Sequence, residues 1–217
     1  MKSLDKIDIT QYPENFRDIH DEMIVIDGAS PLLGFHLMGT ILVDPWDLYK
    51  KGSDIVFTTV SSVSLEETLN YMSSLAKHMA KDPDTMLIKK VVDIHEAKKT
   101  GKLGVVYQFQ PPDPLYGNLE WAWFFKQAGL GICQMTYNQK SEFGYGCAEK
   151  VDKGLTPKGR DLIKVLEEAK IIVDVAHSGV KTALDTIEAA ADIVVCSHGN
   201  ARAVVPSDRN FPDDVLR

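Results

Sequence analysis

The chain has 217 residues, a formal net charge of −7, 44% hydrophobic residues and 25% charged residues, a composition ordinary for a folded globular protein. Its acidic balance, without any basic stretch interleaved with aromatic residues, argues against a nucleic-acid partner. A chain of this length is usually one domain, and we expect a single domain over residues 1–217. No run approaches the ~20 apolar residues of a membrane-spanning helix, so we expect no membrane partner.

Short apolar runs alternate with helical patterns along the chain. The predicted strands are MIVID (23–27), DIVFTTV (54–60), LGVVYQF (103–109), GICQMT (131–136), IIVDVA (171–176) and DIVVCS (192–197). Helices are predicted between them, at 64–81, 118–128, 157–169 and 180–190. This alternation predicts an α/β fold with a parallel sheet, and by itself it allows either an open doubly wound sheet or a (β/α)8 barrel.

The ends of the predicted helices carry suitable residues. Ser64 and Thr156 are N-cap residues, Pro157 suits a first turn, and Gly129 suits a helix stop. The aromatic residues of the second helix are expected to pack onto the sheet: Trp121, Phe124 and Phe125.

Two of the predicted strands stop at a histidine, His177 in IIVDVAHSG and His198 in IVVCSHGNARAV. They lie about one strand–helix unit apart, so we expect them at the ends of neighbouring strands, where α/β proteins bind ligands and metals. A single histidine at such a place is more often a hydrogen-bonded core residue. Two in succession, each beside small residues, favour a shared ligand and suggest half of a metal centre.

The cysteines and the start of the chain indicate the compartment. Cys133, Cys147 and Cys196 are widely spaced and form no CxxC pair, which is evidence against a disulfide framework or a thiolate zinc site. Cys196 is expected to be a small buried residue of its strand. Residues 1–16 contain no apolar segment of signal-peptide length, so we expect a cytoplasmic protein.

Residues 131–217 contain five ordered motifs: TYN after a strand, the loop and helix start GCAEKVDKGLTPKGR, DVAHSG, SHGNARAV, and RNFPDDVLR at the end. In their order and spacing these motifs resemble the membrane (renal) dipeptidase family of metallopeptidases. VIDG at 25–28 and LGVVYQFQ at 103–110 fit more loosely. The loop 138–155 within this region either covers an active site or is a surface excursion.

The resemblance implies a (β/α)8 barrel of the TIM type that hydrolyses dipeptides at a two-zinc site. His177 and His198 match the two late histidine ligands of one zinc ion. Tyr137 matches a substrate-facing position, and Arg209 matches the arginine that holds the substrate carboxylate, for which a planar guanidinium is well suited. No residue of this chain is assigned as catalytic.

Three positions depart from the family pattern. Ala29 and Pro31 stand where the family has the histidine and aspartate of a DGH-x-D motif, and Gln110 stands where it has the glutamate that bridges the metals. Ala and Pro side chains coordinate nothing, and a neutral amide is a poor zinc ligand. We therefore expect at most one zinc ion, bound by His177 and His198.

The remaining histidines offer little compensation, since only one of them, at position 36, lies near the end of a predicted strand: His20, His36, His78 and His95. The chain also holds only about six of the eight βα units that the resemblance implies. We favour a fragment of a longer protein; otherwise another chain, such as a second copy in a homo-oligomer, must cover the open sheet edges.

Three hypotheses about function follow. The first is a metal-dependent hydrolase acting on a dipeptide or related small amide with a degraded first metal site. The second is a non-catalytic homologue that binds a small carboxylated ligand. The third is a structural subunit with a vestigial pocket.

Overall fold

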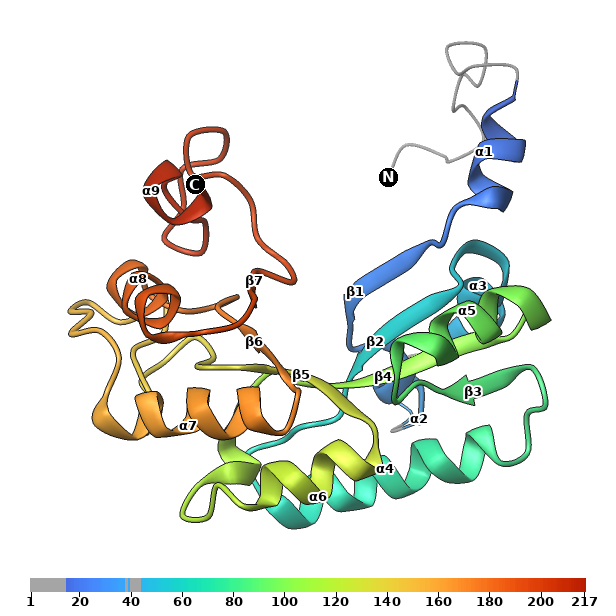
Figure 1. Cartoon of the computed structure of the whole chain (residues 1–217), viewed down its shortest axis with the longest axis horizontal. Helices are drawn as coiled ribbons and strands as arrows, with labels where there is room; N and C mark the ends of the chain where they lie inside the picture. The colour runs from blue at the N-terminus through green and yellow to red at the C-terminus, as the bar shows by residue number, and fades with distance from the viewer. Residues whose placement is uncertain (1–14, 38, 40–43) are drawn as a thin grey trace.

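The structure, a computed structural model, describes residues 15–37, 39 and 44–217 (Figure 1). Its strands are β1 (Ile26–Ser30), β2 (Ile55–Thr59), β3 (Thr85–Leu87), β4 (Leu103–Phe109), β5 (Leu130–Gln134), β6 (Ile172–Asp174) and β7 (Val194–Val195). They form one sheet in the order β1-β2-β4-β5-β6-β7, and β3 pairs with the start of β4. Every pairing between these strands is parallel, so their carboxyl ends lie at one edge.

Helices connect the strands and cover the sheet. They are α1 (Phe16–Glu22), α2 (Leu32–Leu37), α3 (Pro45–Gly52), α4 (Leu65–Met79), α5 (Val91–Thr100), α6 (Trp121–Ala128), α7 (Pro157–Glu168), α8 (Val180–Ala189) and α9 (Asp213–Leu216), with a 3-10 turn η3 (Asp113–Leu115). In Figure 1, α4, α6 and α7 are all drawn on the same side of the sheet. The predicted α/β fold with a parallel sheet is confirmed.

The four predicted helices are present, and three of them begin or end at a predicted capping residue. Oγ of Ser64 accepts the backbone N–H of Glu67 at 3.2 Å, and Oγ1 of Thr156 accepts that of Gly159 at 3.0 Å. Gly129 ends α6 in the left-handed region with φ of 113°, which glycine adopts at little cost.

The core lies between β4, which is buried along its whole length, and the helices packed on it. Phe125 of α6 is fully buried and packs edge-on against Phe109 of β4, with ring centroids 4.7 Å apart. Phe124 is 49% exposed, so the prediction that the aromatic stripe of α6 packs onto the sheet holds for Phe125 and is wrong for Phe124.

One strand of the sheet was not predicted, and one further expectation is wrong. The sequence indicates no strand at β3, because three residues are too few to show a pattern. Cys196 is exposed, because β7 has two residues and ends before it, at the edge of the described sheet. Among the described residues, no helix is long and apolar enough to cross a membrane.

Candidate functional site

The carboxyl edge of the sheet brings the predicted site residues together. His177 follows β6 and His198 follows β7, and these two strands are paired in parallel. Tyr137 and Gln110 follow β5 and β4, the next strands along the sheet. The expectation that the two histidines follow neighbouring strands is therefore confirmed, while their role as metal ligands stays a prediction.

The two imidazoles face each other through their Nε2 atoms, which lie 2.9 Å apart. Their ring centroids are 4.9 Å apart and the ring planes cross at 64°. His177 has φ of 66°, in the left-handed region that a non-glycine residue occupies at a cost of order 1 kcal/mol. The fold thus holds His177 in an unfavourable backbone conformation that directs its ring at His198.

Each imidazole has an oxygen neighbour at its other nitrogen. Nδ1 of His177 lies 2.6 Å from Oδ1 of Asn138, and Nδ1 of His198 lies 2.8 Å from Oγ of Ser197. Ser197 in turn lies 2.5 Å from Oδ2 of Asp174, which is fully buried on β6. Neighbours of this kind orient histidines that bind metals through Nε2.

Burial favours the neutral form of both imidazoles. Burial lowers the pKa of His177 to about 3, with further contributions from the Arg209 cation and from His198. Burial and Arg209 also lower the pKa of His198, while Asp174 acts in the opposite direction. Neutral imidazole is the form that binds metal ions.

Tyr137 and Arg209 complete the group. The ring of Tyr137 stacks on that of His177, with centroids 4.3 Å apart, and is 42% exposed. Nη2 of Arg209 donates to the backbone carbonyl of His198 at 2.8 Å. Nη1 of Arg209 is buried and has no hydrogen-bond partner among the described residues. The structure therefore gathers all four residues that the sequence singled out.

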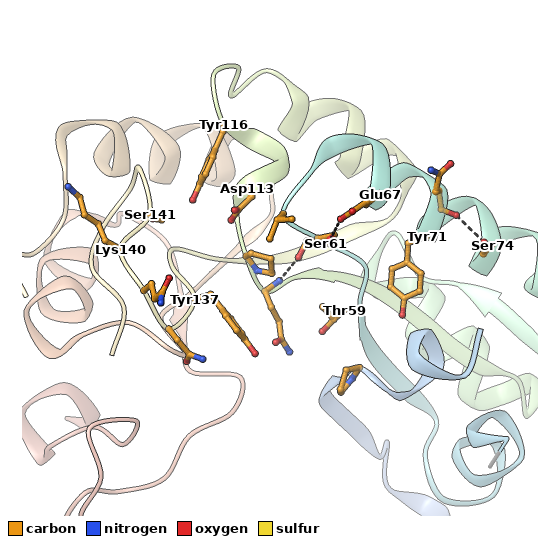
Figure 2. A pocket seen from close by; sticks show the side chains of 18 of the residues that line it. Thr59, Ser61, Glu67, Tyr71, Ser74, Asp113, Tyr116, Tyr137, Lys140 and Ser141 are labelled. Carbon is orange, nitrogen blue, oxygen red and sulfur yellow. Dashed lines mark hydrogen bonds between the residues drawn. The ribbon is translucent and has the colours of Figure 1, made fainter. Parts of the chain in front are cut away.

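A cavity of about 1150 Å³ opens beside this group (Figure 2). Its lining includes Tyr137 and Gln110 from the strand ends, Pro31 after β1, and residues 138–141 of the long loop. Figure 2 shows Tyr137, Thr59 and Asp113 projecting toward the open space. Part of the loop 138–155 thus lies at a cavity, while its role as the cover of an active site stays a prediction.

The two facing imidazoles lie close enough together to contact one metal ion. A separation of 2.9 Å is less than twice the Zn–N distance of about 2.0–2.1 Å, so one ion can contact both Nε2 atoms. Within the described ranges, no group of three or more His, Cys, Asp or Glu side chains could hold a metal. A Cβ on Gly28 would lie 3.4 Å from the carbonyl oxygen of Ser197, so the end of β1 approaches the histidines and offers Ala29 and Pro31 there.

Sequence reasoning missed Asn138, Asp174 and Ser197, which hold the histidines. Two of them could have been found because they are adjacent in sequence to predicted site residues: Ser197 directly precedes His198, and Asn138 directly follows Tyr137 in the TYN motif. Asp174 belongs to a predicted strand that is otherwise apolar. Its carboxylate contacts the site only because β7 pairs with β6 and brings Ser197 within hydrogen-bond distance.

The curated proteins similar to this chain include an uncharacterized protein and a dipeptidase. An uncharacterized protein in the PQQ-III 3' region of Acinetobacter calcoaceticus is 26% identical over 174 residues, which are 77% of this chain and 54% of that protein. Dipeptidase tcpJ of Claviceps purpurea is 24% identical over 177 residues, 79% of this chain and 42% of that protein. The chain spans about half the length of these curated relatives.

Solved structures show the same fold. An amidohydrolase from Pseudomonas aeruginosa is 29% identical with a TM-score of 0.81, over 92% of this chain and 60% of that one. A metallo peptidase from Rhodobacter sphaeroides, liganded with a phosphinate mimic of the dipeptide L-Ala-D-Ala, has a TM-score of 0.75 at 18% identity, over 89% of this chain and 70% of that one. The strands thus form a half-barrel of the (β/α)8 type, the class of fold that was predicted.

The family pattern itself matches most of the chain. The sequence profile of the membrane dipeptidase family (peptidase family M19) matches residues 49–217, which include Tyr137, His177, His198 and Arg209. The chain therefore belongs to the membrane dipeptidase family.

Proposed function

We propose that this chain binds a dipeptide or a related small amide at the carboxyl edge of its sheet, with a single zinc ion held by His177 and His198. The observation that carries the proposal is the pair of Nε2 atoms 2.9 Å apart, each on a neutral ring whose Nδ1 already has an oxygen neighbour. Such rings have only Nε2 left to offer, and both point to one place. The first metal position of the family, at Ala29, Pro31 and Gln110, is proposed to be lost.

Tyr137 and Arg209 are proposed to hold the substrate. Tyr137 reaches from the histidines into the cavity, so its ring can contact a ligand on the side away from His177. Arg209 has an unpartnered Nη1 beside its bond to the His198 carbonyl, and a substrate carboxylate would satisfy it after a small movement of the guanidinium. A zinc ion, when bound, would polarise the amide carbonyl.

A second candidate function is non-catalytic binding of a small carboxylated ligand. It is favoured by the same three replacements, because Ala29, Pro31 and Gln110 supply neither an imidazole nor a carboxylate at the first metal position, while Tyr137 and Arg209 remain. In that case the cavity recognises a ligand without turning it over.

The deciding measurement is the zinc content of the purified protein by elemental analysis, together with an assay on a panel of dipeptides. One zinc ion per chain and hydrolysis that a chelator abolishes are expected for the first proposal. No zinc, with thermal stabilisation by a carboxylated ligand and no turnover, would select the second. Two zinc ions per chain would overturn the proposed loss of the first site. As a control, the variant His177→Gln with His198→Gln should lose the metal.

A further inference from the structure

The hydrogen bonds around Ser197 can run in only one direction. Oδ1 of Asp174 accepts the backbone N–H groups of Ala176 at 2.8 Å and of Ser197 at 3.1 Å. Its Oδ2 then accepts the hydroxyl proton of Ser197 at 2.5 Å. Nε2 of Gln108 donates to the same hydroxyl oxygen at 3.3 Å. The hydroxyl of Ser197 has one proton, which it donates in the hydrogen bond to Asp174. Toward His198, Ser197 can therefore only accept a hydrogen bond.

The protons of both imidazoles follow from this direction. Nδ1 of His198 must carry the proton that Oγ of Ser197 accepts at 2.8 Å. On the other side, the carbonyl oxygen of Asn138 accepts from Nδ1 of His177 at 2.6 Å, and the Cys147 thiol donates to the same oxygen. A neutral imidazole has one N–H, so both Nε2 atoms carry lone pairs, and these face each other 2.9 Å apart.

We propose that Asp174 is a positioning residue that, through Ser197, keeps the proton of His198 on Nδ1 and so makes the two facing Nε2 atoms a paired site for one cation. The inference rests on the proposed metal site, since Asp174 acts by preparing it. Without Asp174, the obvious arrangement at 2.9 Å is an Nε2–H···Nε2 hydrogen bond between the rings, which would occupy both lone pairs needed by a metal.

The substitution Asp174→Asn tests this by changing one atom. The two backbone N–H groups of Ala176 and Ser197 would fix the amide oxygen in the place of Oδ1, which leaves the amide NH2 facing Ser197. Ser197 would then accept from Asn and from Gln108, and its own proton would turn to Nδ1 of His198. The proton of His198 would move to Nε2 and form the hydrogen bond to His177.

The tautomers are read directly by long-range 1H–15N correlation spectra of the metal-free full chain with 15N-labelled histidine. We expect the Nδ1–H form for His177 and His198 in the natural protein, and the Nε2–H form for His198 alone in Asp174→Asn. Zinc affinity, measured by titration, should fall about 10- to 100-fold in the variant, the range typical of residues that orient metal ligands. If Asp174 served folding alone, the folded Asp174→Asn variant would keep both the tautomer of His198 and the zinc affinity of the natural protein.

Asp54→Asn is the matched control. Oδ2 of Asp54 accepts the backbone N–H of Val25 at 2.8 Å and the ammonium of Lys98 at 3.1 Å, at the amino end of β2. This variant should lose stability and keep both histidine tautomers and the zinc affinity of the natural protein.

The outcomes separate this inference from the proposed function. If Asp174→Asn keeps His198 in the Nδ1–H form, or if the natural protein already has Nε2–H, the inference about Asp174 is overturned whatever the zinc content. If the tautomers change as expected and the natural protein binds no zinc, Asp174 positions His198 as inferred and the proposed metal site is wrong.

Discussion

The ring of Tyr137 lies stacked on the imidazole of His177, with centroids 4.3 Å apart and planes inclined by 29°. One face of Tyr137 therefore supports a histidine of the candidate site while the side chain remains 42% exposed toward the cavity. Tyr137 therefore has two roles, to pack against His177 and to line the cavity, and substitutions can separate them.

Removing only the hydroxyl of Tyr137 should leave the histidine pair intact. We expect Tyr137→Phe to keep the stacking, the stability and the zinc affinity, whereas Tyr137→Ala should lose about 0.5–1.5 kcal/mol of unfolding free energy with the aromatic contact. Urea denaturation and zinc titration of both variants check this. A loss in Tyr137→Phe equal to that in Tyr137→Ala would show that the hydroxyl, and not the ring, supports His177.

Arg209 should discriminate between ligands by their carboxylate. A hydrogen bond to a charged group contributes about 1.5–3 kcal/mol, so Arg209→Ala should weaken binding of a dipeptide with a free carboxylate by roughly 10- to 100-fold. Binding of the same dipeptide as its C-terminal amide should change little, and calorimetric titration of the two ligands gives the comparison. Equal losses for both ligands would assign Arg209 to holding the His198 loop rather than the ligand.

Restoring the family's first metal ligands should raise the zinc content. The triple variant with Ala29→His, Pro31→Asp and Gln110→Glu places imidazole and carboxylate groups at the end of β1 and after β4, and β1 approaches Ser197 through Gly28. We expect zinc per chain, measured by elemental analysis, to increase by one. Gln110→Ala in place of Gln110→Glu is the control. An unchanged zinc content in a folded triple variant would contradict the assignment of these positions.

The carboxyl group of Asp113, which lines the cavity, should make stability depend on pH. Burial raises its pKa, and the hydrogen bond with Tyr116 opposes the shift. Because the pKa in the folded state exceeds the ~3.9 of an unfolded chain, the folded state is favoured most below ~3.9 and loses this advantage as pH rises through the folded value. Asp113→Asn should therefore gain stability at neutral pH relative to the natural protein.

Denaturation curves at acid and neutral pH measure the effect of Asp113→Asn. Asp161→Asn, at an exposed position of α7, is the control and should follow the natural protein at both pH values. A stability difference between Asp113→Asn and the natural protein that is the same at acid and neutral pH would contradict the prediction.

The buried and exposed aromatic residues of α6 should differ strongly. Phe125 is fully buried against Phe109, so Phe125→Ala should lower the free energy of unfolding by about 3–5 kcal/mol. Phe124 is 49% exposed, so Phe124→Ala should lower it far less. Thermal unfolding of the two variants makes the comparison, and similar losses would contradict the burial assigned to α6.

Local patterns in the sequence were enough for the α/β class with a parallel sheet, while the choice of a barrel depended on the family resemblance. Apolar runs alternating with capped helices predicted the parallel sheet, because a strand buried on both faces and a helix with a Ser or Thr cap have short-range signatures. The spacing of His177 and His198 placed them on neighbouring strands, because one βα unit advances the chain by one strand. The motifs that surround Tyr137 and Arg209 indicated the family.

Only the tertiary structure decided how the site is held. The three-residue β3 is stabilised by pairing with β4, and Cys196 is exposed because β7 is short; neither has a local signature. Asn138 contacts His177 directly and Asp174 contacts His198 through Ser197, because the ends of β5, β6 and β7 lie at one edge of the sheet. The sequence by itself determined which residue types were available, while the register and order of the strands determined which atoms meet, because hydrogen bonds depend on distances that sequence separation does not set.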